Sequence, residues 1–283
     1  MQRGAPTRPR LAPRLAPRLG FVLAALPLVV YSTLESRRGA ALEAVALSHI
    51  DPLQNPSLPL KALAEALTGT LYEGLSRERA AMAAELAEAG MHTDRAQLAA
   101  VAFALTAAVL LAAGATRRGP RRGDMLLVAI CCLVPGLCAP VLTLASGTEL
   151  PLLGRVVLSY EAKSILGVVA GLAEAGAIVP ALAVATFSIG VPLVKLLTLA
   201  WESAAGAFPS LAGPPGILAT ATHHAGRWSM VDVFVVAIVV AFTAGRTGDA
   251  GATALGLGVW FFGAYALLSQ ISAQVADHAS VRR

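Results

Sequence analysis

The sequence predicts an all-α membrane protein, in which a transmembrane hairpin with a helical insert precedes a four-helix transmembrane module. Of the 283 residues, 56% are hydrophobic and only 14% are charged, and the mean hydropathy is +0.68. Soluble domains carry about 25% charged residues. The apolar residues also gather in long segments that are separated by clusters of basic residues. We therefore expect much of the surface to face lipid.

The apolar segments have the length of membrane spans. A helix needs roughly 20 mostly apolar residues to cross about 30 Å of hydrocarbon. Six segments approach this length, and the first and fifth are short. They are residues 19–34, 96–115, 125–145, 177–201, 229–245 and 252–271.

Basic residues predict the orientation, because Lys and Arg are enriched in cytoplasmic loops. The tail at 1–18 holds five arginines and no acidic residue, and the loop at 116–124 holds four arginines. We expect these two segments and the tail at 275–283 to be cytoplasmic. An even number of spans follows, with both termini inside. The net charge of +5 thus reflects membrane anchoring and not binding of nucleic acid.

Residues 19–34 leave an alternative open, because a short apolar run after a basic stretch is also typical of a cleaved signal peptide. Arg37 and Arg38 directly after the run, and the lack of a nearby small-x-small site, argue for a retained helix. Either reading places the following segment outside.

The segment 35–95 within the hairpin 19–115 is the one extensive water-facing region and holds nine of the 17 acidic residues. Ser76 can cap a helix that ends at Gly90, and Thr93 can cap the membrane helix that follows. We interpret the segment as a small helical cap, or alternatively as a docking surface for another envelope protein. Leucines recur in it at helical spacing, at Leu60, Leu63, Leu67 and Leu71.

Lys195 and Asp232 are the ionisable residues placed most deeply in apolar segments. A charge at the centre of a bilayer costs about 2.5–3.5 kcal/mol, so such residues usually face the bundle interior or a cavity. Lys195 lies about 9 Å before Trp201, and Asp232 lies about 6 Å after Trp228. Equal depth favours an ion pair whose rupture accompanies opening of a cavity. The alternative is that Lys195 snorkels and Asp232 lies in the first turn of its helix.

Pro192 interrupts an otherwise continuous helical run and predicts a kink, since it removes a backbone donor and crowds the carbonyl of Ser188. Ser188, Pro192 and Lys195 share one helix face. This face is either a polar stripe that lines a groove or a packed kink.

Interface and partner contacts are expected at two further places. Arg227 and Trp228 directly precede the fifth span and Ser229 begins it, so they are expected to anchor the helix or contact a lipid headgroup. Glu161 and Lys163 are expected on the outside, facing a partner or simply solvent.

No catalytic or metal constellation is found in the sequence, so we expect neither an enzyme nor a cofactor or metal. His223 and His224 are adjacent and point about 100° apart on a helix, which prevents chelation of one ion. The cysteines, which are Cys131, Cys132 and Cys138, lie in one apolar stretch and form no C-x-x-C pair.

Three motifs in the second half resemble the paraquat-inducible protein A family of bacterial inner-membrane proteins. Residues 161–166 read EAKSIL, residues 187–197 read FSIGVPLVKLL, and residues 226–236 read GRWSMVDVFVV. The resemblance covers about residues 125–274, which we expect to form the family's four-helix membrane module. Better-studied members carry two modules and zinc ribbons, whereas this sequence has one module and no ribbon.

The resemblance implies a component of an intermembrane lipid-transport system in the inner membrane. Such a component passes phospholipid-like substrates between the membrane and a periplasmic MCE-domain protein. One alternative is a scaffold that anchors the MCE assembly without moving lipid. Another is a membrane thiol oxidoreductase that uses the three cysteines.

Overall fold

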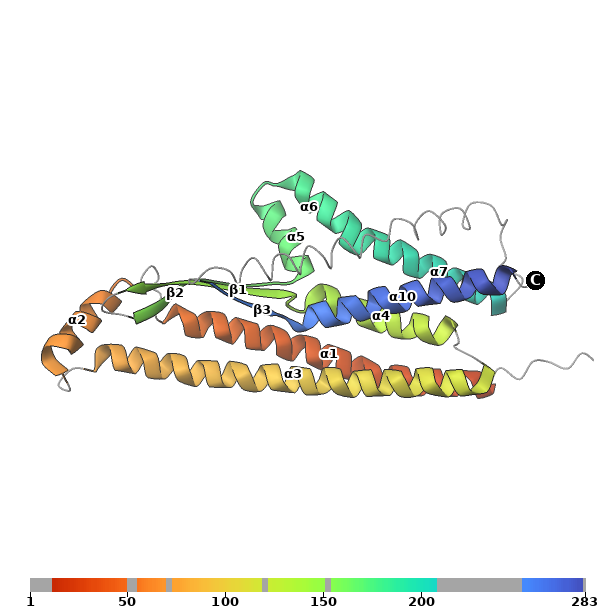
Figure 1. Cartoon of the computed structure of the whole chain (residues 1–283), viewed down its shortest axis with the longest axis horizontal. Coiled ribbons are helices and arrows are strands. Elements are labelled where there is room, and N and C mark those ends of the chain that lie inside the picture. Colours follow the sequence, from red (N-terminus) through yellow and green to blue (C-terminus); the bar gives the residue numbers. More distant parts are fainter. Residues whose placement is uncertain are drawn as a thin grey trace, which may run out of the picture.

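The computed structural model is an elongated helical molecule built on one long hairpin (Figure 1). It describes residues 12–49, 55–69, 73–118, 122–150, 154–207 and 251–281. We call the end of the hairpin where α1 begins and α3 ends the termini end, and the opposite end the α2 end. The elements are α1 (Ala12–Ser48), α2 (Leu58–Thr68), α3 (Gly74–Arg118), α4 (Arg122–Cys138), β1 (Leu142–Leu150), β2 (Gly154–Lys163), α5 (Ile165–Glu174), α6 (Ile178–Ala185), the π-helical turn η2 (Thr186–Gly190), α7 (Val191–Ala207), β3 (Gly251–Leu255) and α10 (Leu257–Val281).

Helices α1 and α3 pack along each other and are longer than a bilayer is thick. Their 37 and 45 residues correspond to about 55 and 67 Å, against about 30 Å of hydrocarbon. Phe21 of α1 packs against Phe103 of α3 near the termini end, with ring centroids 6.2 Å apart. Further out, a Cβ at Gly39 would lie 2.8 Å from Thr93 Oγ1, so the two backbones approach closely there. The hairpin therefore projects well beyond the membrane.

The prediction that a helix ends at Gly90 and another begins at Thr93 is wrong. Helix α3 runs from Gly74 to Arg118 without ending at Gly90, and α1 continues to Ser48 instead of stopping at the predicted membrane boundary. A glycine within a helix costs only about 1 kcal/mol. Packing of α3 against α1 outweighs that cost, so neither Ser76 nor Thr93 begins a separate helix.

The second half of the chain packs on the hairpin through α4 and α10, and α7 packs on α4 and α10. A Cβ at Gly136 of α4 would lie 2.9 Å from the Phe262 backbone of α10, so these two helices are in close contact. Phe261 of α10 reaches Phe103 of α3, with ring centroids 5.6 Å apart. One apolar core, which includes the buried Cys132, thus joins α1, α3, α4, α7 and α10.

The predicted class of helical membrane protein is confirmed. Three of the described helices are long and apolar enough to cross a membrane, within Ala16–Ser48, Gly74–Ala115 and Ile178–Ser203. Their outward side chains are apolar, as at Leu23 and Leu98, which are 75% and 71% exposed. Helix α4 has 17 residues and begins at Arg122, and the predicted span 229–245 lies outside the described residues.

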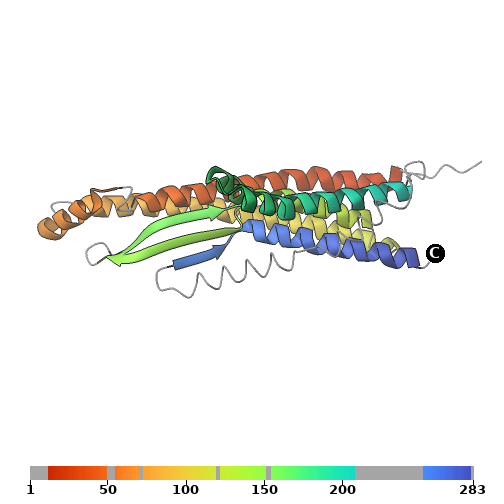
Figure 2. The ribbon, with the colours of Figure 1, turned by 90° about the horizontal axis from the view of Figure 1, so that it is seen from above.

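A three-stranded antiparallel sheet, in the order β2-β1-β3, is the element that the sequence analysis did not foresee. It replaces the ends of two predicted spans: residues 142–145 belong to β1 and residues 252–255 to β3. Pro140 favours the end of α4 at Cys138 before β1, because a proline disfavours helix in the residue before it. Figure 2 shows the strands extending from α4 and α10 toward the α2 end.

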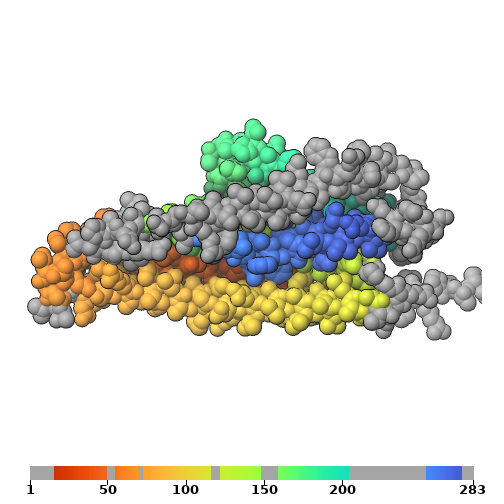
Figure 3. All heavy atoms as spheres, in the orientation of Figure 1, coloured from red at the N-terminus to blue at the C-terminus, as the bar shows by residue number. Residues whose placement is uncertain are grey.

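Helices α5 and α6 form a short hairpin that stands out from the body of the molecule (Figure 3). Ser164 caps α5 by accepting a hydrogen bond from the Gly167 amide at 3.0 Å. Gly176, with a φ of 76°, makes the turn into α6. The exposed side chains of α6 are apolar and include Val179 and Leu182. Helix α6 continues through η2 into α7, as the predicted span 177–201 requires.

Gly256 joins β3 to α10 at the tightest point of the fold. Its amide donates to the Val141 carbonyl at 2.9 Å, and a Cβ here would lie 2.1 Å from the Pro140 carbonyl oxygen. We expect Gly256→Ala to destabilise the protein by about 1–3 kcal/mol, because the backbone of Pro140 must move. The measurement is the melting temperature of the detergent-solubilised protein, with the remaining folded fraction after heating determined by size-exclusion chromatography.

Gly263→Ala is the matched control, because a Cβ at Gly263 meets nothing within 4 Å. It lies inside α10, where alanine favours helix. We expect its melting temperature to equal or exceed that of the wild type. Equal melting temperatures for the two variants would contradict the close packing at Gly256.

Candidate functional site

A stripe of polar side chains, all buried except the half-buried Gln270, runs through the apolar bundle between η2 and α7 on one side and α10 on the other. We call it the polar stripe, and its central group is the Lys195 ammonium, on a residue that is only 6% exposed. The Lys195 Nζ donates a hydrogen bond to Gln270 Oε1 of α10 at 3.0 Å. The stripe consists of Ser188, Lys195, Thr198, Ser269, Gln270 and Ser272.

The local sequence of α7 places Ser188 and Lys195 on the inner face. Pro192 has no amide hydrogen and would crowd the Ser188 carbonyl in a regular α-helix. The chain responds with the π-helical turn η2 directly before it, in which the Val191 amide donates to the Thr186 carbonyl, five residues back. Such turns are frequent at functional sites. The kink predicted at Pro192 thus takes the form of a π-helical turn, and Ser188 and Pro192 are both buried.

The Lys195 ammonium is under-compensated among the described residues. Its one partner there is the neutral amide of Gln270, and no described carboxylate contacts it. A buried cation held by a dipole alone keeps much of its desolvation cost. Lys195 therefore favours any anion that can enter the bundle at its depth.

The predicted pair of Lys195 with Asp232 remains a prediction, because Asp232 lies outside the described residues. The same holds for Arg227, Trp228 and Ser229 at the expected interface, and for His223 and His224. The structure instead identifies Gln270, which the sequence analysis missed. Its signal was available, since Ser269 and Gln270 interrupt the apolar run of the last span and Ser272 directly follows it.

Polar contacts join α1, α4, α7 and α10 at the termini end, on that side of the polar stripe. Arg18 of α1 contacts Asp124 of α4 at 2.6 Å, and Arg122 of α4 contacts Glu202 of α7. The Ser272 hydroxyl of α10 donates to the Arg122 carbonyl at 3.5 Å. Lys195 precedes Glu202 by seven residues, or about 10 Å along the helix. Lys195 therefore lies well inside the bundle, in line with the predicted depth.

Glu161 and Lys163 lie on strand β2, outside the apolar bundle, and both are exposed. Their side chains pair with each other at 3.2 Å. Tyr160, directly before Glu161, points to the other face of the sheet, and its hydroxyl donates to Glu43 of α1 at 2.7 Å. This contact fixes the sheet to the hairpin, and burial together with the Glu43 carboxylate raises the pKa of Tyr160 above its ordinary value.

The described part of the chain holds no group of three or more His, Cys, Asp or Glu side chains placed to bind a metal ion. Cys131, Cys132 and Cys138 lie on α4 as free thiols, and Cys132 is buried in the core. The hydrogen-bonded contact between Lys195 and Gln270 is thus the most distinctive chemical feature inside the bundle.

A double-mutant cycle measures this contact. We expect Gln270→Leu to lower stability by about 1–3 kcal/mol, because the buried Lys195 ammonium loses its acceptor. Adding Lys195→Met should restore much of that loss, so the two substitutions are not additive. The measurement is the melting temperature of the wild type, both single variants and the double variant. Additive effects would show that the contact contributes nothing.

Two comparisons find no relative of this chain: neither the curated proteins nor the solved structures give a match. A third comparison finds a match: the family model of paraquat-inducible protein A matches residues 125–281. This range spans α4, the sheet, the α5–α6 hairpin, α7 and α10, and it contains the polar stripe. The chain therefore belongs to the paraquat-inducible protein A family.

Proposed function

We propose that this chain is the inner-membrane component of an intermembrane lipid-transport system. It passes phospholipid-like molecules between the membrane and a periplasmic MCE-domain protein, without catalysing a reaction. The family assignment supports this proposal, together with the implications of the motifs in its second half. The single observation that carries it is the buried Lys195 ammonium in an apolar bundle, whose one partner among the described residues is the neutral amide of Gln270.

The proposed orientation places the termini end in the cytoplasm. Arg18 and Arg122 lie at this end, and the α1–α3 hairpin and the sheet then project into the periplasm. Excess Lys and Arg on the cytoplasmic side support this orientation. The projecting elements offer a partner protein a rigid surface, which includes the exposed Glu161 and Lys163.

The proposed mechanism uses the polar stripe as the path of the headgroup. Asp232 is the resting partner of Lys195, and rupture of this pair frees the ammonium for the phosphate of a phospholipid. The π-helical turn lets α6 move relative to α7, because such a turn interrupts the regular hydrogen-bond ladder. The exposed apolar side chains of α6, such as Val179 and Leu182, face the acyl chains.

A scaffold that anchors the MCE assembly is the second candidate, and the length of the hairpin favours it. The outer half of α1 and α3 reaches far beyond the bilayer and has no part in the polar stripe. A scaffold needs this surface but does not need Lys195. The two functions therefore differ in their response to substitutions in the stripe.

The test is transfer of labelled phospholipid from proteoliposomes that contain the full chain to the soluble part of its MCE partner. We expect Lys195→Met and Asp232→Asn to reduce transfer at least tenfold, which corresponds to about 1.4 kcal/mol. The reason is that each substitution removes one charge of the proposed pair. Both variants should still bind the partner.

Two controls separate charge from position. Lys195→Arg keeps the cation and should retain most of the transfer. Leu197→Met changes an exposed residue on the outer face of the same helix and should have no effect. Full transfer by Lys195→Met would exclude the proposed path, and partner binding with no lipid transfer by the wild type would establish the scaffold.

A further inference from the structure

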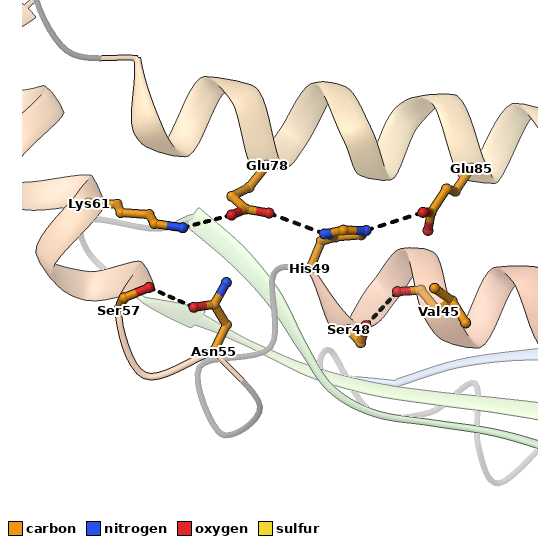
Figure 4. A network of polar contacts seen from close by, with 8 residues as sticks. All are labelled: Val45, Ser48, His49, Asn55, Ser57, Lys61, Glu78 and Glu85. Atoms are coloured by element: carbon orange, nitrogen blue, oxygen red, sulfur yellow. Dashed lines mark hydrogen bonds and ion pairs between the residues drawn. The ribbon is translucent and has the colours of Figure 1, made fainter.

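His49, at the end of α1, joins the outer half of the hairpin to α3 through two glutamates (Figure 4). Its Nδ1 lies 3.1 Å from Glu78 Oε2, and its Nε2 lies 3.3 Å from Glu85 Oε1. Glu78 and Glu85 are two turns apart on the same face of α3. We call this arrangement of His49, Glu78 and Glu85 the His49 bridge.

The geometry of the His49 bridge requires a charged imidazole. A neutral histidine has one N–H donor and one lone pair, whereas the imidazolium form has two donors. Both ring nitrogens face carboxylate oxygens, which only accept hydrogen bonds when they are ionised. Loss of one proton would therefore leave a lone pair against a carboxylate and break one of the two contacts.

The two glutamates differ in the hydrogen-bond partners that would remain if His49 lost its proton. Glu78 also accepts a hydrogen bond from the Lys61 ammonium of α2 at 2.7 Å. Glu85 has no such second cation: its Oε2 is buried and lacks a hydrogen-bond partner among the described residues. Deprotonation of His49 therefore leaves Glu85 as an uncompensated, partly buried carboxylate, which is costly.

His92 provides an internal comparison nearer the membrane. Its Nδ1 contacts Glu35 Oε2 at 2.5 Å, while its Nε2 is 4.0 Å from Glu88 Oε1. A neutral imidazole that carries its proton on Nδ1 can keep the short contact. Arg38 also donates to Glu35, at 3.1 Å. The link at His92 thus needs one N–H donor, whereas the link at His49 needs two.

We infer that the His49 bridge is a pH-sensitive connection, which holds the outer ends of α1 and α3 together when His49 is protonated and releases them when it is neutral. The outer parts of α1, α2, α3 and β2 carry the other titratable and charged groups near the bridge. They are Glu35, Arg37, Arg38, Glu43, Lys61, Glu65, Arg77, Arg79, Glu88, His92, Asp94, Arg95, Tyr160, Glu161 and Lys163.

The direction of the pH effect follows from the environment of His49. Partial burial opposes the charge of the imidazole, but the hydrogen bonds with Glu85 and Glu78 outweigh that effect and raise the pKa of His49. A raised pKa stabilises the folded hairpin at pH values below the ordinary one of about 6.5. This stabilisation is lost as the pH rises through the folded-state value.

Loss of the His49 contacts would also affect α2 and the sheet, which lie next to the hairpin. Glu43, six residues earlier on α1, accepts the hydrogen bond from Tyr160 that fixes the sheet. Lys61 connects α2 to Glu78 of the same bridge. The His49 bridge thus adjoins α2 and the part of α1 to which the sheet is fixed, and this inference does not depend on lipid transport.

Amide hydrogen exchange of the full chain in lipid nanodiscs tests the inference at pH 5.5 and 8.5, with labelling times scaled for intrinsic exchange. We expect protection of residues 40–49 and 58–68 to fall at pH 8.5. The fall is about tenfold for each unit by which the folded pKa of His49 exceeds the unfolded one. Protection of residues 96–115 should stay constant.

Three variants make the result specific. His49→Gln should exchange rapidly at both pH values, and His49→Arg, a permanent cation, should remain protected at both. His92→Gln should keep the pH dependence of the wild type. Equal protection of the wild type at the two pH values would overturn the inference, as would an unchanged pH dependence in His49→Gln.

Discussion

The close packing of α1 against α3 is the interaction on which the other elements depend. Small residues, alanine and glycine, let the two helices approach closely, as at Gly39. Phe21 and Phe103 fill the wider part of the contact. Helix α4 and strand β2 both rest on α1. The hairpin thus provides the surface on which α4 and β2 pack.

Polar contacts lie at three levels along the long axis of the molecule. Ion pairs of Arg18 and Arg122 lie at the termini end, one under-compensated lysine lies inside the bundle, and the histidine–glutamate contacts lie outside it. Within a low-dielectric bundle an ion without a counter-ion is expensive. That cost explains why, among the described residues, the middle level holds one cation with neutral hydroxyl and amide groups.

Several features were predictable because they follow from local properties of the chain. The membrane class follows from composition, and the family follows from the motifs around Pro192 and Asp232. The inward face of Ser188 and Lys195 follows from helical spacing. In contrast, the sheet and the unbroken α3 were missed. Both depend on contacts between residues far apart in the sequence, such as Gly256 with Pro140 and Gly39 with Thr93.

The sequence by itself determined that the chain is a membrane protein, where its apolar segments lie and which helix carries the buried lysine, because apolar length and helical period are local quantities. The tertiary structure alone decided that Gln270 accepts from Lys195 and that His49 lies between Glu78 and Glu85. These partners are 75, 29 and 36 residues apart. No periodicity brings such residues together, and only the packing of the helices does.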